Sequence, residues 1–139
     1  MRVVIDTNVL LVSLPRTSAD HLIFLELVRG KYSLCVTTDI LDEYAEIFQQ
    51  KANPEVAALA LDLLDILPNL ERIHKYYFWR MIAADPDDNK FVDCAVSARA
   101  DFIVSDDTHF NEVKGKFPPV RVISKLEFME MLKRSDADA

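Results

Sequence analysis

The chain is poor in glycine and in cysteine, with two residues of each among its 139. Because glycine occurs only at Gly30 and Gly115, no glycine-rich loop is available to hold a nucleotide phosphate, which argues against P-loop and Rossmann types of nucleotide binding. Cys35 and Cys94 lie in apolar stretches, and neither belongs to a C-x-x-C pair or a Cys/His cluster. We therefore interpret them as buried free thiols rather than as a disulfide or a zinc site.

Long apolar runs are also missing. Near the N-terminus Asp6 ends the hydrophobic stretch, so neither a signal peptide nor a membrane span is indicated, and we expect a cytoplasmic protein. Half of the residues are nevertheless hydrophobic, which is enough to build one core. A length of 139 residues is typical of one domain, and no repeat or linker divides the chain.

Basic residues are fewer than acidic ones, 16 against 23, and the formal net charge is −7. Taken alone, this charge argues against a nucleic-acid binder, whose phosphate contacts usually come from a basic face. Clustered carboxylates account for part of the imbalance, and cations bound to them would reverse the local field. Charge therefore leaves the question of nucleic-acid binding open.

The hydrophobic pattern alternates between short β-branched runs and longer amphipathic segments. We expect strands at 2–6, 32–37, 102–105 and 120–123, with a short edge strand in the less clear stretch after residue 70. We expect helices at 18–29, 39–51, 54–67, 88 or 89 to 100, and from the capping box at 124–127 onward. Such alternation predicts an α/β fold with a mostly parallel central sheet flanked by helices on both faces.

Acidic residues follow two of these strands directly. Asp6 ends the run Val3-Val4-Ile5, and Asp106-Asp107 follow the strand at 102–105. Because ligand sites on open α/β sheets gather at the carboxyl ends of the strands, we expect these acids to lie close together. Asn8 is placed to fix Asp6 or to bond the water shell of a metal. The alternative for Asp6 is an ordinary N-cap or turn aspartate.

Glu43 lies inside a predicted helix rather than at its end. Ile40 precedes it by three residues and Ile47 follows it by four, which places the carboxylate on the stripe that faces the core. A partly buried acid requires a partner. From the sequence, a metal ion and a salt bridge to Lys or Arg are equally compatible with Glu43.

A third acidic group opens the helix that begins near residue 88. Asp87 and Asp88 lie in its first turn, where capping and the helix dipole also favour aspartate, and Asp93 lies one turn further, near Asn89. Lys90 is placed either to contact a phosphate or to neutralise these acids. Since the candidate ligands are oxygen donors without nearby Cys or His, they favour Mg²⁺ or Mn²⁺, and such ions suit the hydrolysis of a phosphodiester.

Four sequence segments together resemble PIN-domain ribonucleases, and most closely the toxin components of bacterial toxin–antitoxin pairs. These segments are Val-Ile-Asp6-Thr-Asn8-Val-Leu, the inner Glu43, Asp85-Pro-Asp-Asp88-Asn-Lys-Phe91 and Ile103-Val-Ser-Asp-Asp107-Thr-His-Phe110. The resemblance spans residues 1 to about 132. It implies a single PIN-like domain over 1–134, Mg²⁺ or Mn²⁺ as cofactor, and endonucleolytic cleavage of RNA. It also implies a cognate antitoxin as partner. Independently of the resemblance, we expect a disordered tail at 135–139.

The resemblance assigns roles to individual residues. Asp6, Glu43, Asp88 and Asp107 match the four family acids that bind metal and carry catalysis. Counting back from the strand at 102–105 places Asn89 in the third position instead, with Asp93 contributing. The residues that match supporting positions are Thr7, Asn8 and Ser105, while Asp106 stands where many relatives have glycine.

Two other functions compete with the ribonuclease. One is a Mg-dependent phosphohydrolase acting on small phosphate esters, although a haloacid-dehalogenase-like enzyme would need Asp-x-Asp where this chain has Asp6-Thr-Asn8. The other is a non-catalytic or inactive PIN-like binding module whose acids are caps and salt bridges.

Two surfaces are left with open roles. The aromatic, basic segment 74–80 either stacks on RNA or packs under a loop. The apolar side of helix 54–67 either joins the core or forms a homodimer or antitoxin interface.

Overall fold

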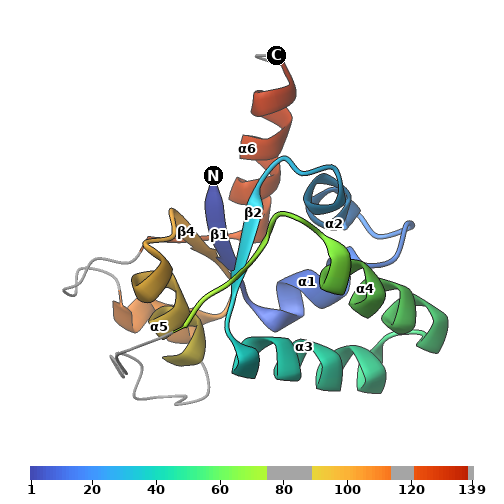
Figure 1. Cartoon of the computed structure of the whole chain (residues 1–139). Helices are drawn as coiled ribbons and strands as arrows, with labels where there is room; N and C mark the ends of the chain where they lie inside the picture. The colour runs from blue at the N-terminus through green and yellow to red at the C-terminus, as the bar shows by residue number, and fades with distance from the viewer. Residues whose placement is uncertain (75–88, 114–120, 138–139) are drawn as a thin grey trace.

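The described residues 1–74, 89–113 and 121–137 of the computed structural model form an α/β fold around one five-stranded sheet (Figure 1). Its strands lie in the order β3-β2-β1-β4-β5, and every pairing is parallel. The strands are β1 (Arg2–Ile5), β2 (Ser33–Val36), β3 (Leu70–Arg72), β4 (Phe102–Val104) and β5 (Val122–Ile123). The predicted parallel sheet is confirmed, and the stretch after residue 70 supplies its edge strand.

Helices cover both sides of this sheet. They are α1 (Thr7–Ser13), α2 (His21–Val28), α3 (Thr38–Lys51), α4 (Pro54–Ile66), α5 (Asn89–Ala98) and α6 (Lys125–Ala137), with a 3-10 helix at Thr108–Val113. In Figure 1, α5 lies on one side of the strands and α1, α3 and α4 lie on the other. This arrangement buries the strands on both faces, which explains their nearly continuous hydrophobic runs.

The middle of the sheet is the centre of the core. Val3, Val4 and Ile5 of β1 are fully buried. The hydroxyl of Tyr44 on α3 donates a hydrogen bond to the carbonyl oxygen of Ile5, and the Tyr44 ring stacks on Phe48 with 5.8 Å between centroids. Helix α3 is therefore fixed against the end of β1, and its position determines where Glu43 lies.

The strand order also brings two distant segments of the chain together. Ile5 pairs with Val104, and the amide of Asp6 donates a hydrogen bond to the carbonyl oxygen of Val104 at 3.0 Å. The next residue on each strand is therefore Asp6 on one side and Ser105 on the other. Both leave the sheet side by side at its carboxyl edge.

Several elements differ from the sequence prediction. The largest difference is α1, which was not predicted because it follows β1 without a turn, is only one to two turns long and contains the β-branched Val9 and Val12. Helix α3 begins after Thr37 rather than after Thr38 or Asp39. Helix α6 continues to Ala137, into the segment at 135–139 for which a disordered tail was expected.

Other expectations concern cysteines and membrane spans. Cys35 and Cys94 are both free and buried, as predicted. Within the part of the chain that the structure describes, no helix has the length and hydrophobicity needed to cross a bilayer.

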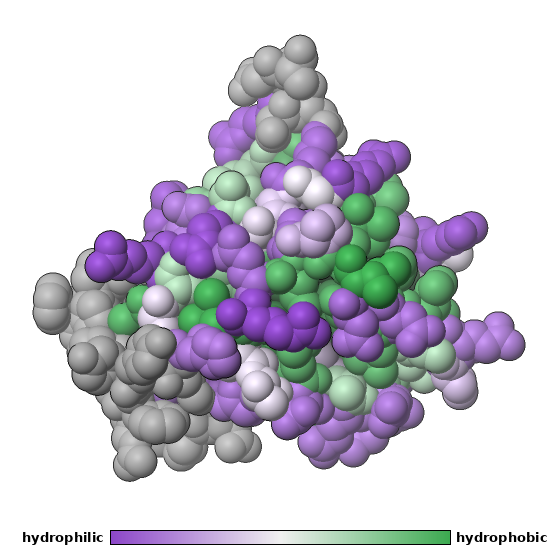
Figure 2. Space-filling model, in the orientation of Figure 1, coloured by the Kyte–Doolittle hydropathy of each residue, from purple (hydrophilic) through white to green (hydrophobic). Residues whose placement is uncertain are grey.

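The apolar side of α4 divides between core and surface. Ala60 is 2% exposed and belongs to the core, whereas Leu59 is 61% exposed and Ile66 is 75% exposed. Val28 of α2 is also exposed, and Figure 2 shows hydrophobic surface on the side of the molecule where α2 and α4 lie. The core reading is confirmed for Ala60, while the interface reading of this helix stays a prediction.

Candidate active site

Asp6 is a buried carboxylate at the carboxyl edge of the sheet, with 6% of its surface exposed. It occupies the N-cap position of α1, yet its side chain makes no capping hydrogen bond to that helix. Its Oδ2 instead accepts a hydrogen bond from the hydroxyl of Ser105 at 2.8 Å. The side chain therefore faces its neighbours across the sheet edge, and a capping role does not explain it.

The environment of Asp6 makes its charged form costly. The pKa of Asp6 is raised from 3.8 to about 6, chiefly by burial and also by repulsion from the carboxylates of Asp107 and Glu43. The hydrogen bond from Ser105 acts in the opposite direction and lowers this pKa. Three acids therefore interact at one edge of the sheet. Such perturbed carboxyl groups are typical of functional sites.

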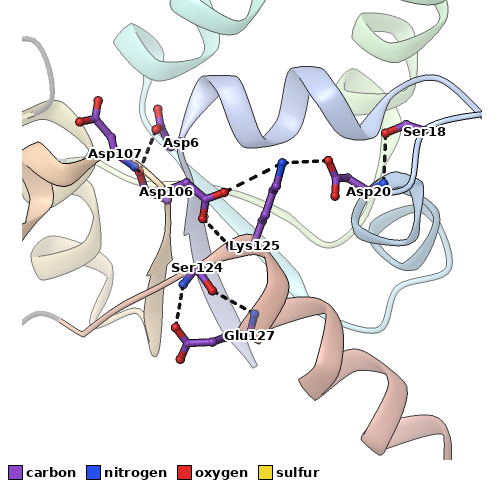
Figure 3. A network of polar contacts seen from close by, with 9 residues as sticks. Asp6, Ser18, Asp20, Asp106, Asp107, Ser124, Lys125 and Glu127 are labelled. Atoms are coloured by element: carbon purple, nitrogen blue, oxygen red, sulfur yellow. Dashed lines mark hydrogen bonds and ion pairs between the residues drawn. The ribbon is translucent and has the colours of Figure 1, made fainter.

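The two adjacent acids after β4 point in different directions (Figure 3). Asp107 is held by its own amide, which donates to Ser105 Oγ at 3.0 Å, and by its Oδ1, which accepts from the amide of His109 at 2.9 Å. Asp106 turns toward α6, where its Oδ1 accepts a hydrogen bond from the amide of Lys125 at 3.0 Å. Asp107 therefore lies beside Asp6, and Asp106 anchors a helix.

Glu43 reaches the same edge from α3. Its carboxylate accepts a hydrogen bond from the hydroxyl of Thr7, the residue that follows Asp6, and pairs with the ammonium of Lys90 at 2.6 Å. Lys90 therefore neutralises Glu43, and its contact with a substrate phosphate stays a prediction. The salt bridge that the sequence allowed for Glu43 is also present.

The third acidic position is only partly described. Asn89 and Asp93 of α5 are both buried, at 8% and 2% exposure, so α5 turns polar side chains inward. Asp88, like Asp85, Asp87 and the aromatic segment beyond His74, lies outside the described residues. The described ranges alone contain no group of three Asp, Glu, His or Cys side chains that could hold a metal ion.

A pocket of about 330 Å³ opens beside Asp6. One wall comes from Asn8, Val9 and Val12 of α1, and the other comes from the loop after β4 and the start of α6. The described residues that line it are Asp6, Asn8, Val9, Val12, Asp106, Asp107 and Lys125. A second pocket of about 320 Å³ lies on the other side of Asp106 and Asp107 and reaches Glu127.

The pocket contains one charged residue that the sequence did not suggest. Lys125 was overlooked because it lies 18 positions after Asp107, inside a segment that read only as a helix start. One signal was available. Strand β5 pairs with β4, so the helix after it begins at the same sheet edge as Asp106.

The supporting residues fall into two groups. Thr7 and Ser105, which are 4% and 5% exposed, contact acids directly through their hydroxyl groups. Asn8 is exposed and lines the pocket beside Asp6. Of the three supporting residues, Ser105 contacts two parts of the site at once, since its Oγ donates to Asp6 and accepts from the amide of Asp107.

Comparison with known proteins agrees with this geometry. The family model described as "PIN domain" matches residues 2–109, which include Asp6, Glu43, Asp88 and Asp107. The chain belongs to the PIN domain family. Members of this family generally use divalent metal ions.

A solved structure confirms the PIN fold. The chain is similar to one in the crystal structure of VapBC2 from Rickettsia felis bound to a DNA fragment from their promoter, with a TM-score of 0.63 and 13% sequence identity. The similarity covers 89% of this chain and 98% of that one. A comparison with curated proteins found no significant match.

Proposed function

We propose that this PIN domain is a metal-dependent endoribonuclease that hydrolyses RNA phosphodiester bonds. The observation that carries the proposal is the buried carboxylate of Asp6, which has a pKa of about 6 and interacts with Asp107 and Glu43. Without a cation, a buried carboxylate in such surroundings would only lower the stability of the fold. A divalent cation bound at this edge would offset the repulsion between the carboxylates, which explains why the acids lie together.

The donor set fits Mg²⁺ or Mn²⁺. The available side chains offer carboxylate oxygens, which these ions prefer. Asp6, Glu43 and Asp107 would hold the ion, with Asp88 as the fourth acid by correspondence with the family. When bound, the metal supplies a hydroxide nucleophile at neutral pH and stabilises the leaving oxygen.

The chain's own residues prepare this site. Ser105 fixes Asp6 and Asp107 relative to each other, because one hydroxyl bonds to both segments. Thr7 orients Glu43, and Lys90 neutralises Glu43 until a metal competes for it. We also assign Asn89 and Asp93 of α5, both buried, to the completion of the site. The side chains that bind the ion therefore have fixed positions before it arrives.

We extend the proposal to a biological role, the toxin of a toxin–antitoxin pair acting in the cytoplasm. The motifs resemble those of such toxins, and the fold is similar to a chain of VapBC2, a protein whose structure was determined on promoter DNA. An antitoxin would then be the partner, and the exposed Leu59 and Ile66 of α4 provide apolar surface for it or for a homodimer.

A second candidate, a non-catalytic PIN-like module, has one observation in its favour. Lys90 already compensates Glu43, and the described residues contain no three-acid group ready for a metal. This candidate predicts that metal ions neither stabilise the protein nor support cleavage. Nothing in the described residues favours a hydrolase of small phosphate esters.

Cleavage of end-labelled single-stranded RNA tests the proposal. The purified protein is incubated with Mg²⁺, with Mn²⁺ or with EDTA, and a DNA strand of the same sequence is run alongside. Internal fragments that require metal and appear only from RNA are expected. Intact RNA with every metal, at enzyme concentrations that saturate binding, would support the non-catalytic module instead.

A further inference from the structure

We propose that Lys125 binds the RNA phosphate that neighbours the scissile phosphate on the same strand. To do so, its ammonium leaves its ion pair with Asp20. This inference rests on the proposed ribonuclease function and identifies how the strand is held. It concerns the pocket beside Asp6, where Lys125 faces α1 across the acidic edge (Figure 3).

The backbone of Lys125 is fixed firmly. Lys125 is the first residue of α6, and its amide donates to Asp106 Oδ1 at 3.0 Å. The preceding Ser124 and the following Glu127 form a reciprocal capping box, with bonds of 3.1 Å from the Glu127 amide and 3.3 Å from the Ser124 amide. The start of the side chain is therefore held beside the pocket regardless of what its ammonium binds.

The ammonium itself has only partial and exchangeable partners. It pairs with Asp20 at 3.0 Å and lies 4.0 Å from Asp106, while the side chain remains 33% exposed. The side chain of Asp20 is 16% exposed, so water and salt reach this ion pair and screen it in part. A lysine ammonium is a compact charge on a flexible stem, so it can turn from Asp20 to a phosphate without movement of the helix.

The charge balance of the pocket explains why such a group is needed. Among the described residues that line it, Asp6, Asp106 and Asp107 are acidic and Lys125 alone is basic. A metal ion at Asp6 would attract the cleaved phosphate, but the neighbouring phosphate would still meet Asp106. Lys90 is not among the described residues that line this pocket, and its ammonium pairs with Glu43 on α3.

The opposite wall suits the rest of a nucleotide. Val9 and Val12 project from α1, and Val12 is 39% exposed, which offers an apolar surface to a ribose or base. The volume of about 330 Å³ is at the lower end of the range for small-ligand pockets, roughly 300–1,000 Å³. The pocket therefore has the size, the apolar wall and the single cation expected of a site for one nucleotide unit.

Steady-state cleavage of a fluorogenic single-stranded RNA tests the role of Lys125. Lys125→Met keeps most of the apolar stem and removes the charge. The matched control is Lys133→Met, which makes the same change at an exposed position about two turns further along α6. We expect Lys125→Met to raise KM roughly fivefold, to affect kcat much less, and to reduce the salt dependence of log KM by about 0.7, the contribution of one phosphate contact to a single strand.

A double-mutant cycle with Asp20→Asn separates this role from a structural one. Freeing the ammonium should lower KM in the Lys125 protein, and the gain should disappear in the Lys125→Met background. An equal gain in both backgrounds, or a KM and salt slope for Lys125→Met that match those of Lys133→Met, would overturn the inference. If the wild-type protein does not cleave RNA, or cleaves it without a metal ion, the proposed function is wrong and the role of Lys125 falls with it.

Discussion

Replacing Asp6 by Asn should make the metal-free protein more stable at neutral pH. Asn has nearly the same shape, and its amide oxygen can still accept the hydrogen bond that Ser105 donates to Asp6 at 2.8 Å. What the substitution removes is a buried negative charge that two neighbouring carboxylates repel. Stability is therefore expected to rise although a hydrogen-bonded residue is changed.

The magnitude follows from the pKa of Asp6. The folded protein holds the proton until about pH 6, whereas the unfolded chain releases it near 3.8. Between these values the folded state binds more protons, so the free energy of unfolding falls as pH rises. A difference of about two pKa units at about 1.36 kcal/mol each gives a cost of about 3 kcal/mol at neutral pH. For a chain of this size that corresponds to a Tm shift of roughly 6–12 °C.

Urea denaturation in EDTA, followed by circular dichroism, measures the effect. At pH 7.5 Asp6→Asn should unfold with a free energy about 2–3 kcal/mol above that of wild type, and the difference should shrink toward zero near pH 4. Asp62→Asn is the control, because it removes an exposed carboxylate of α4 and should change little. A difference that is absent at pH 7.5, or that does not change with pH, would refute the reasoning.

Three further predictions follow from the same geometry. Mn²⁺ should raise the Tm of wild type in a thermal melt, because it relieves repulsion at the sheet edge, and should have little effect on Asp6→Asn; equal shifts in both would place the ion elsewhere. Ser105→Ala should raise the pKa of Asp6 further and move the acidic limb of the cleavage-rate profile to higher pH; an unchanged limb would mean that Asp6 does not control it. Tyr44→Phe should lower the free energy of unfolding by roughly 1–2 kcal/mol in urea, because it leaves the buried Ile5 carbonyl without its partner, and a neutral result would show that this bond contributes nothing net.

Sequence reasoning reached the class of the fold because β1 and β4 carry unambiguous signals. Each is a short β-branched run followed by an acid, and a parallel sheet places both endings at one edge. Helix α1 could not be found in the same way, since seven residues with two valines give no clear helical period. It forms because β1 and the core fix its position, which is information that no local window contains.

The partners of the site residues were harder to predict than the residues themselves. Asp106 and Asp107 are adjacent in sequence, and only the position of α6 decides that the first binds Lys125 while the second stays beside Asp6. The pairing of Lys90 with Glu43 likewise depends on how α5 meets α3. Acids can be recognised from their place in a strand or helix, whereas the cation that each one meets depends on tertiary packing.

The acidic composition can also be reconciled with an RNA substrate. The net charge of −7 argues against general binding of nucleic acid, yet three of the acids, Asp6, Glu43 and Asp107, interact at one edge of the sheet. A metal ion reverses the field locally, and Lys125 adds one positive charge where the strand would continue. The protein would then bind RNA weakly over most of its surface and attract the strand strongly only at the metal ion and Lys125. Such a combination would favour cleavage without tight binding of the RNA.

The most direct test of the central claim is the rate of RNA cleavage in Mn²⁺ by wild type, Asp6→Asn and Asp62→Asn, purified in the same way and checked for folding. Wild type and Asp62→Asn are expected to cleave the RNA. The cleavage rate of Asp6→Asn should be at least about a hundredfold lower, because the metal ion that stabilises the charge developing on the phosphate loses a ligand. Cleavage by Asp6→Asn at the wild-type rate would contradict this claim, because the activity would then belong to a contaminant or to another part of the chain.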